Sequence, residues 1–167
     1  QFVDMGANTG RELYAALRAA AARGVKIRIL ESPGFSGAGK KQESEALRDE
    51  FPNAVSIHQI TMGDWYGGGG IMHQKIWVFD DRHLYLGSAN MDWKSIMQVK
   101  EMGIAVEDSP DLAADAKKYF DGWWMFTQIT PSSIPLFDET TRIYRTVPPW
   151  STLLPAANRQ PSPFDSD

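Results

Sequence analysis

The sequence predicts an α/β fold in which a mixed β-sheet is flanked by helices. Segments with helical spacing of apolar residues alternate along the chain with short apolar runs typical of strands. A glycine separates the first helical segment from the first strand, and a hairpin pattern lies in the middle of the chain. Helix–glycine–strand order of this kind is typical of layered α/β domains.

Size and composition narrow the class of protein. The chain has 167 residues, of which 43% are hydrophobic and 23% charged, as expected for one globular domain with a real core. It contains no cysteine, which excludes disulfides, Cys-based zinc sites and a thiol nucleophile. The net charge of −4 argues against an extended nucleic-acid-coating surface, although an enzyme that acts on chain ends needs only local positive charge.

The first half of the chain contains two helix–strand units. A helix is expected after Thr9, a plausible N-cap, with its end at Gly24. Residues 25–30 alternate apolar and basic side chains and predict a strand, followed by a loop. Residues 42–50 predict a short helix, and residues 55–60 a short strand.

The second half begins with a predicted hairpin, in which strands 72–79 and 83–86 are joined by a turn at Asp80 and its neighbours. A helical turn at 91–97 and a strand at 99–106 follow. Pro110 lies just inside the start of a helix that should run to about Phe126. We therefore expect a half-domain over residues 1–130 and a Pro-rich, extended C-terminal segment over residues 131–167.

The hairpin carries the residues that suggest chemistry. His73 and Lys75 are two positions apart, so on a strand their side chains leave the same face. An imidazole can attack the phosphorus of a phosphate diester, while an ammonium neutralises a non-bridging oxygen. Ser88 and Asn90 follow the glycine at Gly87 and could bind phosphoryl oxygens in the same pocket. None of these groups calls for a metal or another cofactor.

This segment resembles the signature of the phospholipase D superfamily. From His73 to Asn90 it fits the pattern His-x-Lys, four residues, Asp, six residues, Gly-Ser-x-Asn, without a gap. The resemblance implies a phosphohistidine intermediate and two such motifs per active site, with one histidine as the nucleophile and the other as the acid. On that basis His73 has one of these two roles.

The resemblance also assigns the surrounding residues. It implies that Lys75, Ser88 and Asn90 hold phosphate. The acidic residue that often follows the motif by eleven positions is Glu101 here, and it would orient the histidine. Asp80 is a candidate catalytic residue of the motif that could instead brace the hairpin, so Glu101 is the favoured partner of His73.

Residues 10–135 are similar to the first half of the phospholipase D-like 5′-exonucleases, a lysosomal branch of this superfamily. This similarity implies action on single-stranded nucleic acid from the 5′ end, and it suggests a lysosomal, luminal or extracellular location. It leaves open a phospholipid hydrolase or transphosphatidylase, and a non-catalytic half that binds phosphate or completes a partner. Trp65 and Tyr66 could stack a base or anchor a loop.

The sequence contains one motif where the superfamily uses two. His58 and His83 are followed two positions later by Ile60 and Tyr85, so neither begins a second His-x-Lys pattern. The second half must then come from a separate fragment of the same precursor or from a homodimer mate. The strand that the similarity places before the Thr9 helix is missing, which favours the separate fragment.

Overall fold

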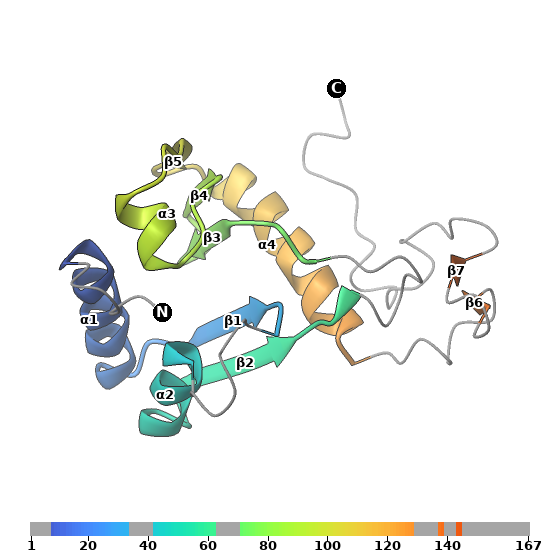
Figure 1. Cartoon of the computed structure of the whole chain (residues 1–167). Helices are drawn as coiled ribbons and strands as arrows, with labels where there is room; N and C mark the ends of the chain where they lie inside the picture. Colours follow the sequence, from blue (N-terminus) through green and yellow to red (C-terminus); the bar gives the residue numbers. More distant parts are fainter. Residues whose placement is uncertain (1–7, 34–41, 63–70, 129–136, 139–142, 145–167) are drawn as a thin grey trace.

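The computed structural model describes residues 8–33, 42–62, 71–128, 137–138 and 143–144 of the chain. It confirms the α/β class, with helices packed against parallel and antiparallel strands (Figure 1). In chain order the elements are α1 (Asn8–Ala22), β1 (Ile27–Glu31), α2 (Glu43–Glu50), β2 (Val55–Gln59), β3 (Ile76–Phe79), β4 (His83–Gly87), α3 (Trp93–Met97), β5 (Gly103–Val106), α4 (Pro110–Phe126), β6 (Phe137–Asp138) and β7 (Ile143–Tyr144).

The first unit is a parallel pair, β1 and β2, in register from Ile27 opposite Val55 to Glu31 opposite Gln59. Parallel strands need a crossover connection, and α2 lies within it. Ala21 of α1, Leu47 of α2 and Val55 of β2 form the buried core of this unit. The predicted helices and strands of this half are confirmed to within two residues.

The start of α1 differs from the prediction, whereas its end agrees with it. The helix begins at Asn8, so Thr9 lies within its first turn and is not the N-cap. Its end is the predicted glycine: Gly24 has a φ of 87°. The Val25 amide donates to the Ala20 carbonyl at 3.1 Å and the Gly24 amide to the Ala21 carbonyl at 2.9 Å. These two bonds form a Schellman motif, which satisfies carbonyls that the last helical turn would leave unpaired.

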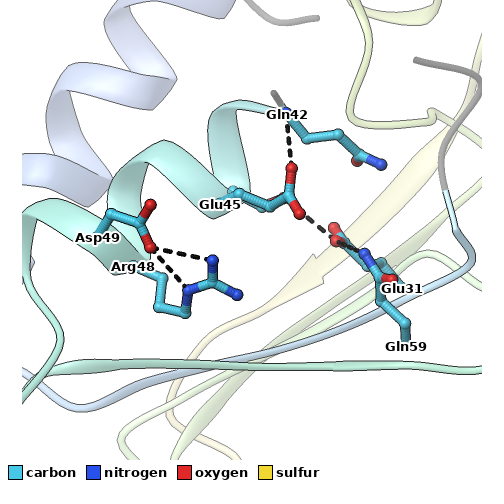
Figure 2. A network of polar contacts seen from close by, with 7 residues as sticks. Glu31, Gln42, Glu45, Arg48, Asp49 and Gln59 are labelled. Carbon is cyan, nitrogen blue, oxygen red and sulfur yellow. Dashed lines mark hydrogen bonds and ion pairs between the residues drawn. The ribbon is translucent and has the colours of Figure 1, made fainter. Parts of the chain in front are cut away.

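Side chains fix the carboxyl end of β1 (Figure 2). The Glu31 carboxylate accepts hydrogen bonds from the Ser44 hydroxyl of α2 at 3.2 Å and from the Gln59 amide of β2 at 3.0 Å. The Glu31 carbonyl accepts the Ile60 amide at 3.0 Å. At the start of α2 the Gln42 amide donates to Glu45 in a capping box. The carboxyl end of β1 is therefore bonded both to α2 and to the end of β2.

The second unit is an antiparallel meander of β3, β4 and β5. Asp80 and Asp81, both with a φ of 53°, form the turn between β3 and β4, and the Arg82 amide donates to the Phe79 carbonyl at 3.0 Å. Two consecutive positive φ values are those of a type I′ hairpin turn, which aspartate tolerates better than most residues. The predicted hairpin is confirmed.

Two predicted strands are shorter in the structure. β3 begins at Ile76 rather than at residue 72, and β5 at Gly103 rather than at residue 99. In both cases a serine hydroxyl takes the place of a strand partner. The Met72 amide donates to Ser32 Oγ, and the Met102 amide to Ser88 Oγ, each at 3.0 Å. A backbone amide that is satisfied by a side chain has no need of a ladder partner.

Helix α4 begins at Pro110 and ends at Phe126, as predicted. It packs along β3 and β4 and continues towards β2 (Figure 1). Trp124 stacks on His58 of β2 with ring centroids 3.8 Å apart, and Arg28 of β1 lies 4.9 Å from the Phe120 ring centroid. The parallel and the antiparallel pairings form separate ladders, and α4 contacts both of them.

Asp121 of α4 forms ion pairs with Lys117 of the same helix and with Arg28 of β1. Burial raises the pKa of its carboxyl, but Lys117 and Arg28, at 2.7 and 2.6 Å, outweigh burial, so its pKa lies below the ordinary value. A carboxyl with a lowered pKa stabilises the fold above its unfolded-state pKa, and this contribution is lost as the pH falls through the folded-state value.

We expect Asp121→Asn to lower the free energy of unfolding by about 1–2 kcal/mol at neutral pH, since two cations lose their partner. The difference from wild type should shrink as the pH falls, because the native carboxyl is then protonated as well. Urea denaturation at several pH values measures both effects. Glu107→Gln, at an exposed position after β5, is the control. Equal stability of Asp121→Asn and wild type at neutral pH would contradict this assignment.

The structure describes only a small part of the predicted C-terminal segment. β6 and β7 form a short antiparallel pair; the rest of the predicted C-terminal segment, 131–167, lies outside the described residues. The division at residue 130 therefore stays a prediction. Trp65 and Tyr66 also lie outside the described residues.

Among the helices that the structure describes, none combines the length and apolar character required to cross a membrane.

Candidate active site

His73 and Lys75 lie on the segment that leads into β3. The Lys75 ammonium donates to the carbonyl of His73 at 2.7 Å, which places the positive charge beside the histidine. The Lys75 carbonyl accepts the Gly87 amide at 3.1 Å, so Lys75 continues the β3–β4 register and lies opposite Gly87. His73 is exposed and Lys75 is buried. An exposed histidine thus lies two residues from a buried lysine whose ammonium is bonded to the histidine's own backbone carbonyl.

The electrostatics of Lys75 bring two carboxylates into the site. Burial lowers the pKa of the Lys75 ammonium, and the negative charges of Glu101 and Asp92 oppose this effect. The predicted neighbour Glu101 is therefore close enough to act on Lys75. Within the described residues no hydrogen bond joins Glu101 to His73, so its predicted role in orienting the imidazole stays a prediction.

Asp92 was not predicted from the sequence. Its carboxylate accepts the Ser95 amide at 2.9 Å at the start of α3, while its charge acts on Lys75. An aspartate three residues before the bonded amide is a common helix-capping pattern. That pattern could have located Asp92 at a helix start, but it gives no indication that Lys75 lies nearby.

Ser88 and Asn90 follow β4. The Ser88 hydroxyl accepts the Met102 amide at 3.0 Å and donates to the Met102 carbonyl at 3.2 Å. A hydroxyl has one proton, so Ser88 would have to release the Met102 carbonyl before it could donate to a phosphoryl oxygen. The Asn90 side chain is exposed and makes no hydrogen bond to the described residues. The Asn90 amide is therefore freer than the Ser88 hydroxyl to bind a phosphoryl oxygen.

Asp80 lies in the hairpin turn and is exposed. It is five residues from Lys75 along an extended strand, a separation of roughly 16 Å at the usual rise per residue. The structure thus places Asp80 at the opposite end of β3 from His73, where it supports the turn. The charge of Glu101 acts on Lys75, whereas Asp80 is not among the charges that act on it.

A pair of glycines opposite Lys75 makes room for an aromatic ring. Gly87 and Gly103 face each other across β4 and β5, and a Cβ on either would overlap the Tyr85 ring. In the structure the space beside Gly87 is filled by Tyr85. These glycines therefore let an aromatic side chain lie flat across the strands that carry the site.

We expect Gly103→Ala to lower the free energy of unfolding by about 1–3 kcal/mol, because the added methyl forces the Tyr85 ring to move. In a Tyr85→Leu background the same substitution should cost clearly less, since the clash is gone. Urea denaturation of the four proteins of this cycle measures the coupling. Additive costs would show that Tyr85 does not require Gly103.

The chain is similar to proteins of known family. Residues 2–124 match the family model described as "Cardiolipin synthase, PLD-like domain". The chain is 37% identical over 132 residues to the 5′-3′ exonuclease PLD3 of Bos taurus, covering 79% of this chain and 26% of that protein. It is 40% identical over 115 residues to a probable phospholipase D of Caenorhabditis elegans, covering 69% of this chain and 20% of that protein.

A solved structure supports the fold. NucT from Helicobacter pylori superposes with a TM-score of 0.53 at 24% identity, covering 66% of this chain and 69% of that chain. The chain spans about a quarter of the length of the curated exonucleases that it matches. The His-x-Lys segment and the β3–β5 meander lie within the stretch matched by the family model. By this match, which covers well over half of its residues, the chain belongs to the phospholipase D-like domain family.

Proposed function

We propose that the chain is half of a phosphodiesterase that works through a phosphohistidine, and that its substrate is single-stranded nucleic acid cleaved from the 5′ end. The observation that carries the proposal is the exposed His73, whose backbone carbonyl accepts a hydrogen bond from the buried ammonium of Lys75. An attacking nitrogen and a fixed positive charge are the two groups that displacement at a phosphate diester requires. Several 5′-3′ exonucleases among the relatives favour the nucleic-acid substrate.

The reaction takes two displacements. One histidine forms a bond to phosphorus while the bond to the leaving oxygen breaks, and the second histidine gives that oxygen a proton. Water then attacks phosphorus and releases the first histidine, after the second histidine has taken a proton from the water. His73 fills one of these roles and its counterpart in the other half fills the second. Every bond and proton is accounted for by side chains and water.

The other residues stabilise charge. The Lys75 ammonium neutralises charge on the phosphoryl oxygens and the Asn90 amide donates hydrogen bonds to them. Ser88 donates as well if its proton leaves the Met102 carbonyl. The charge of Glu101 opposes the lowering of the Lys75 pKa by burial. In the proposed reaction Glu101 also orients His73. Asp80 contributes through the hairpin turn that aligns β3 with β4.

The complete site needs a second half. The chain has one His-x-Lys motif, and the proposed reaction uses two histidines. We propose that the second motif comes from a separate fragment of the same precursor, with a homodimer mate as the alternative. A denaturing mass measurement of the active preparation distinguishes one kind of chain from two.

A phospholipid substrate is the second candidate. Ile71, two residues before His73, is 59% exposed, and Met102, beside Glu101, is 82% exposed. Apolar side chains at the rim of a phosphate site suit a lipid surface. One of the relatives is named a probable phospholipase D.

The test uses a preparation that contains both halves, with chelator present, between pH 5 and 8. Its substrates are a 5′-hydroxyl single-stranded oligonucleotide and, separately, phosphatidylcholine vesicles. Stepwise release of nucleotides from the 5′ end supports the exonuclease. Cleavage of the lipid alone would replace it with the second candidate, and no cleavage of either would indicate a phosphate-binding half without catalysis.

A further inference from the structure

Two serines make the same kind of contact with residues next to candidate catalytic residues. Ser88 Oγ bonds both the amide and the carbonyl of Met102, the residue after Glu101. Ser32 Oγ accepts the amide of Met72, the residue before His73, at 3.0 Å and lies 3.5 Å from the Met72 carbonyl. In each case a hydroxyl accepts the backbone amide of a residue next to a candidate catalytic residue, although the Met102 carbonyl also accepts the Ser88 backbone amide at 2.9 Å.

Ser32 lies on a rigid support. It follows Glu31, whose carboxylate and carbonyl are bonded to α2 and to the end of β2. Met72, by contrast, precedes β3 and has no strand partner. The bond from Ser32 thus ties the His73 segment to the carboxyl end of β1, 40 residues earlier in the chain.

The far side of the same segment is fixed too. Gln74 donates to the Tyr119 hydroxyl of α4, and the Lys75 carbonyl accepts the Gly87 amide of β4. Without Ser32, the Met72 amide would lose the hydrogen bond that holds it among the described residues, while the backbone after His73 kept its own bonds. His73 would then move relative to Lys75, and catalysis tolerates misplacement of about 1 Å poorly.

We propose that Ser32 is a positioning residue for His73, acting through the Met72 amide without touching the substrate. The proposal rests on the function proposed above, in which His73 reacts at phosphorus. An ordinary loop serine would not affect the position of His73. Threonine keeps the hydroxyl, and its β-branch suits the extended backbone after a strand, whereas alanine leaves the Met72 amide without its acceptor.

Kinetics of the complete two-half enzyme provide the first test. We expect Ser32→Ala to lower kcat by about tenfold or more with KM changed little, since positioning affects the reacting geometry rather than ground-state binding. Ser32→Thr should recover most of the loss. Ser56→Ala, on the exposed face of β2, is the matched control and should keep the wild-type kcat. A wild-type kcat in Ser32→Ala, or equal losses in the alanine and threonine variants, would overturn the proposal.

A second measurement does not depend on activity. The chain has three histidines, so their ring signals in ¹⁵N NMR spectra can be assigned with one His→Gln variant each. We expect Ser32→Ala to broaden or double the His73 ring signals and to leave those of His83 unchanged. His73 signals identical to wild type would overturn the proposal even if the enzyme proved inactive on every substrate. Altered signals in an inactive enzyme would support the positioning role and contradict only the proposed function.

Discussion

His73→Ala is expected to lower the turnover of the assembled enzyme by about 10³-fold or more, whether His73 is the nucleophile or the acid. A nucleophile cannot be replaced by a methyl group, and loss of the acid leaves the departing oxygen without a proton. KM should change less than kcat, because Lys75 and Asn90 still hold the phosphate. Initial rates on the preferred substrate measure both constants.

His83→Ala is the matched control for this prediction. His83 lies in β4, and its Nδ1 accepts the Asp108 amide at 3.1 Å, so it is an imidazole with a structural partner. We expect it to retain close to wild-type turnover. If His73→Ala turned over as fast as His83→Ala, His73 would have no catalytic role.

Lys75→Met is expected to lower kcat/KM by about 10²–10³-fold, because the charge on the phosphoryl oxygens loses its counterion in a partly water-excluded position. Methionine keeps the length and apolar character of the side chain. Lys26→Met is the matched control: the Lys26 ammonium also donates to a backbone carbonyl at 2.7 Å, that of Asn53, but away from the site.

The same substitution should stabilise the fold, or leave it unchanged, at neutral pH. Burial lowers the pKa of Lys75, which means that the folded state holds this proton less tightly than the unfolded state does. A lysine of this kind weakens the fold at pH values where the unfolded chain is protonated, and the effect disappears as the pH rises above the unfolded-state pKa. Reduced activity together with unchanged or increased stability would show that Lys75 serves function rather than folding. A strongly destabilised Lys75→Met would contradict the account of the site.

The elements that the sequence predicted well are those with local signals. Pro110 marks the start of α4, Gly24 marks the end of α1, and Asp80 with Asp81 marks the hairpin turn. The starts of β3 and β5 were missed because Ser32 and Ser88 satisfy amides that a strand would otherwise pair. No local pattern signals a bond between residues 40 positions apart.

The site shows the same division. The spacing of His73 and Lys75, and the position of Glu101, predicted a cluster in which Glu101 orients His73. The structure shows an effect of the Glu101 charge on Lys75, and the role towards His73 stays a prediction. The contribution of Asp92 and the ring of Tyr85 over two glycines could not be predicted, because both depend on how β4, β5 and α3 pack together. Long-range packing of this kind leaves no periodic signal in a single sequence.

The most direct test of the central claim is to look for a covalent phosphohistidine during turnover. The assembled enzyme would be mixed with excess oligonucleotide, quenched within milliseconds at alkaline pH, digested and analysed by mass spectrometry. We expect a phosphoryl-linked adduct on His73 or on the corresponding histidine of the second half, and neither adduct nor turnover in His73→Ala. Turnover without an adduct on either histidine, unaffected by His73→Ala, would contradict the mechanism.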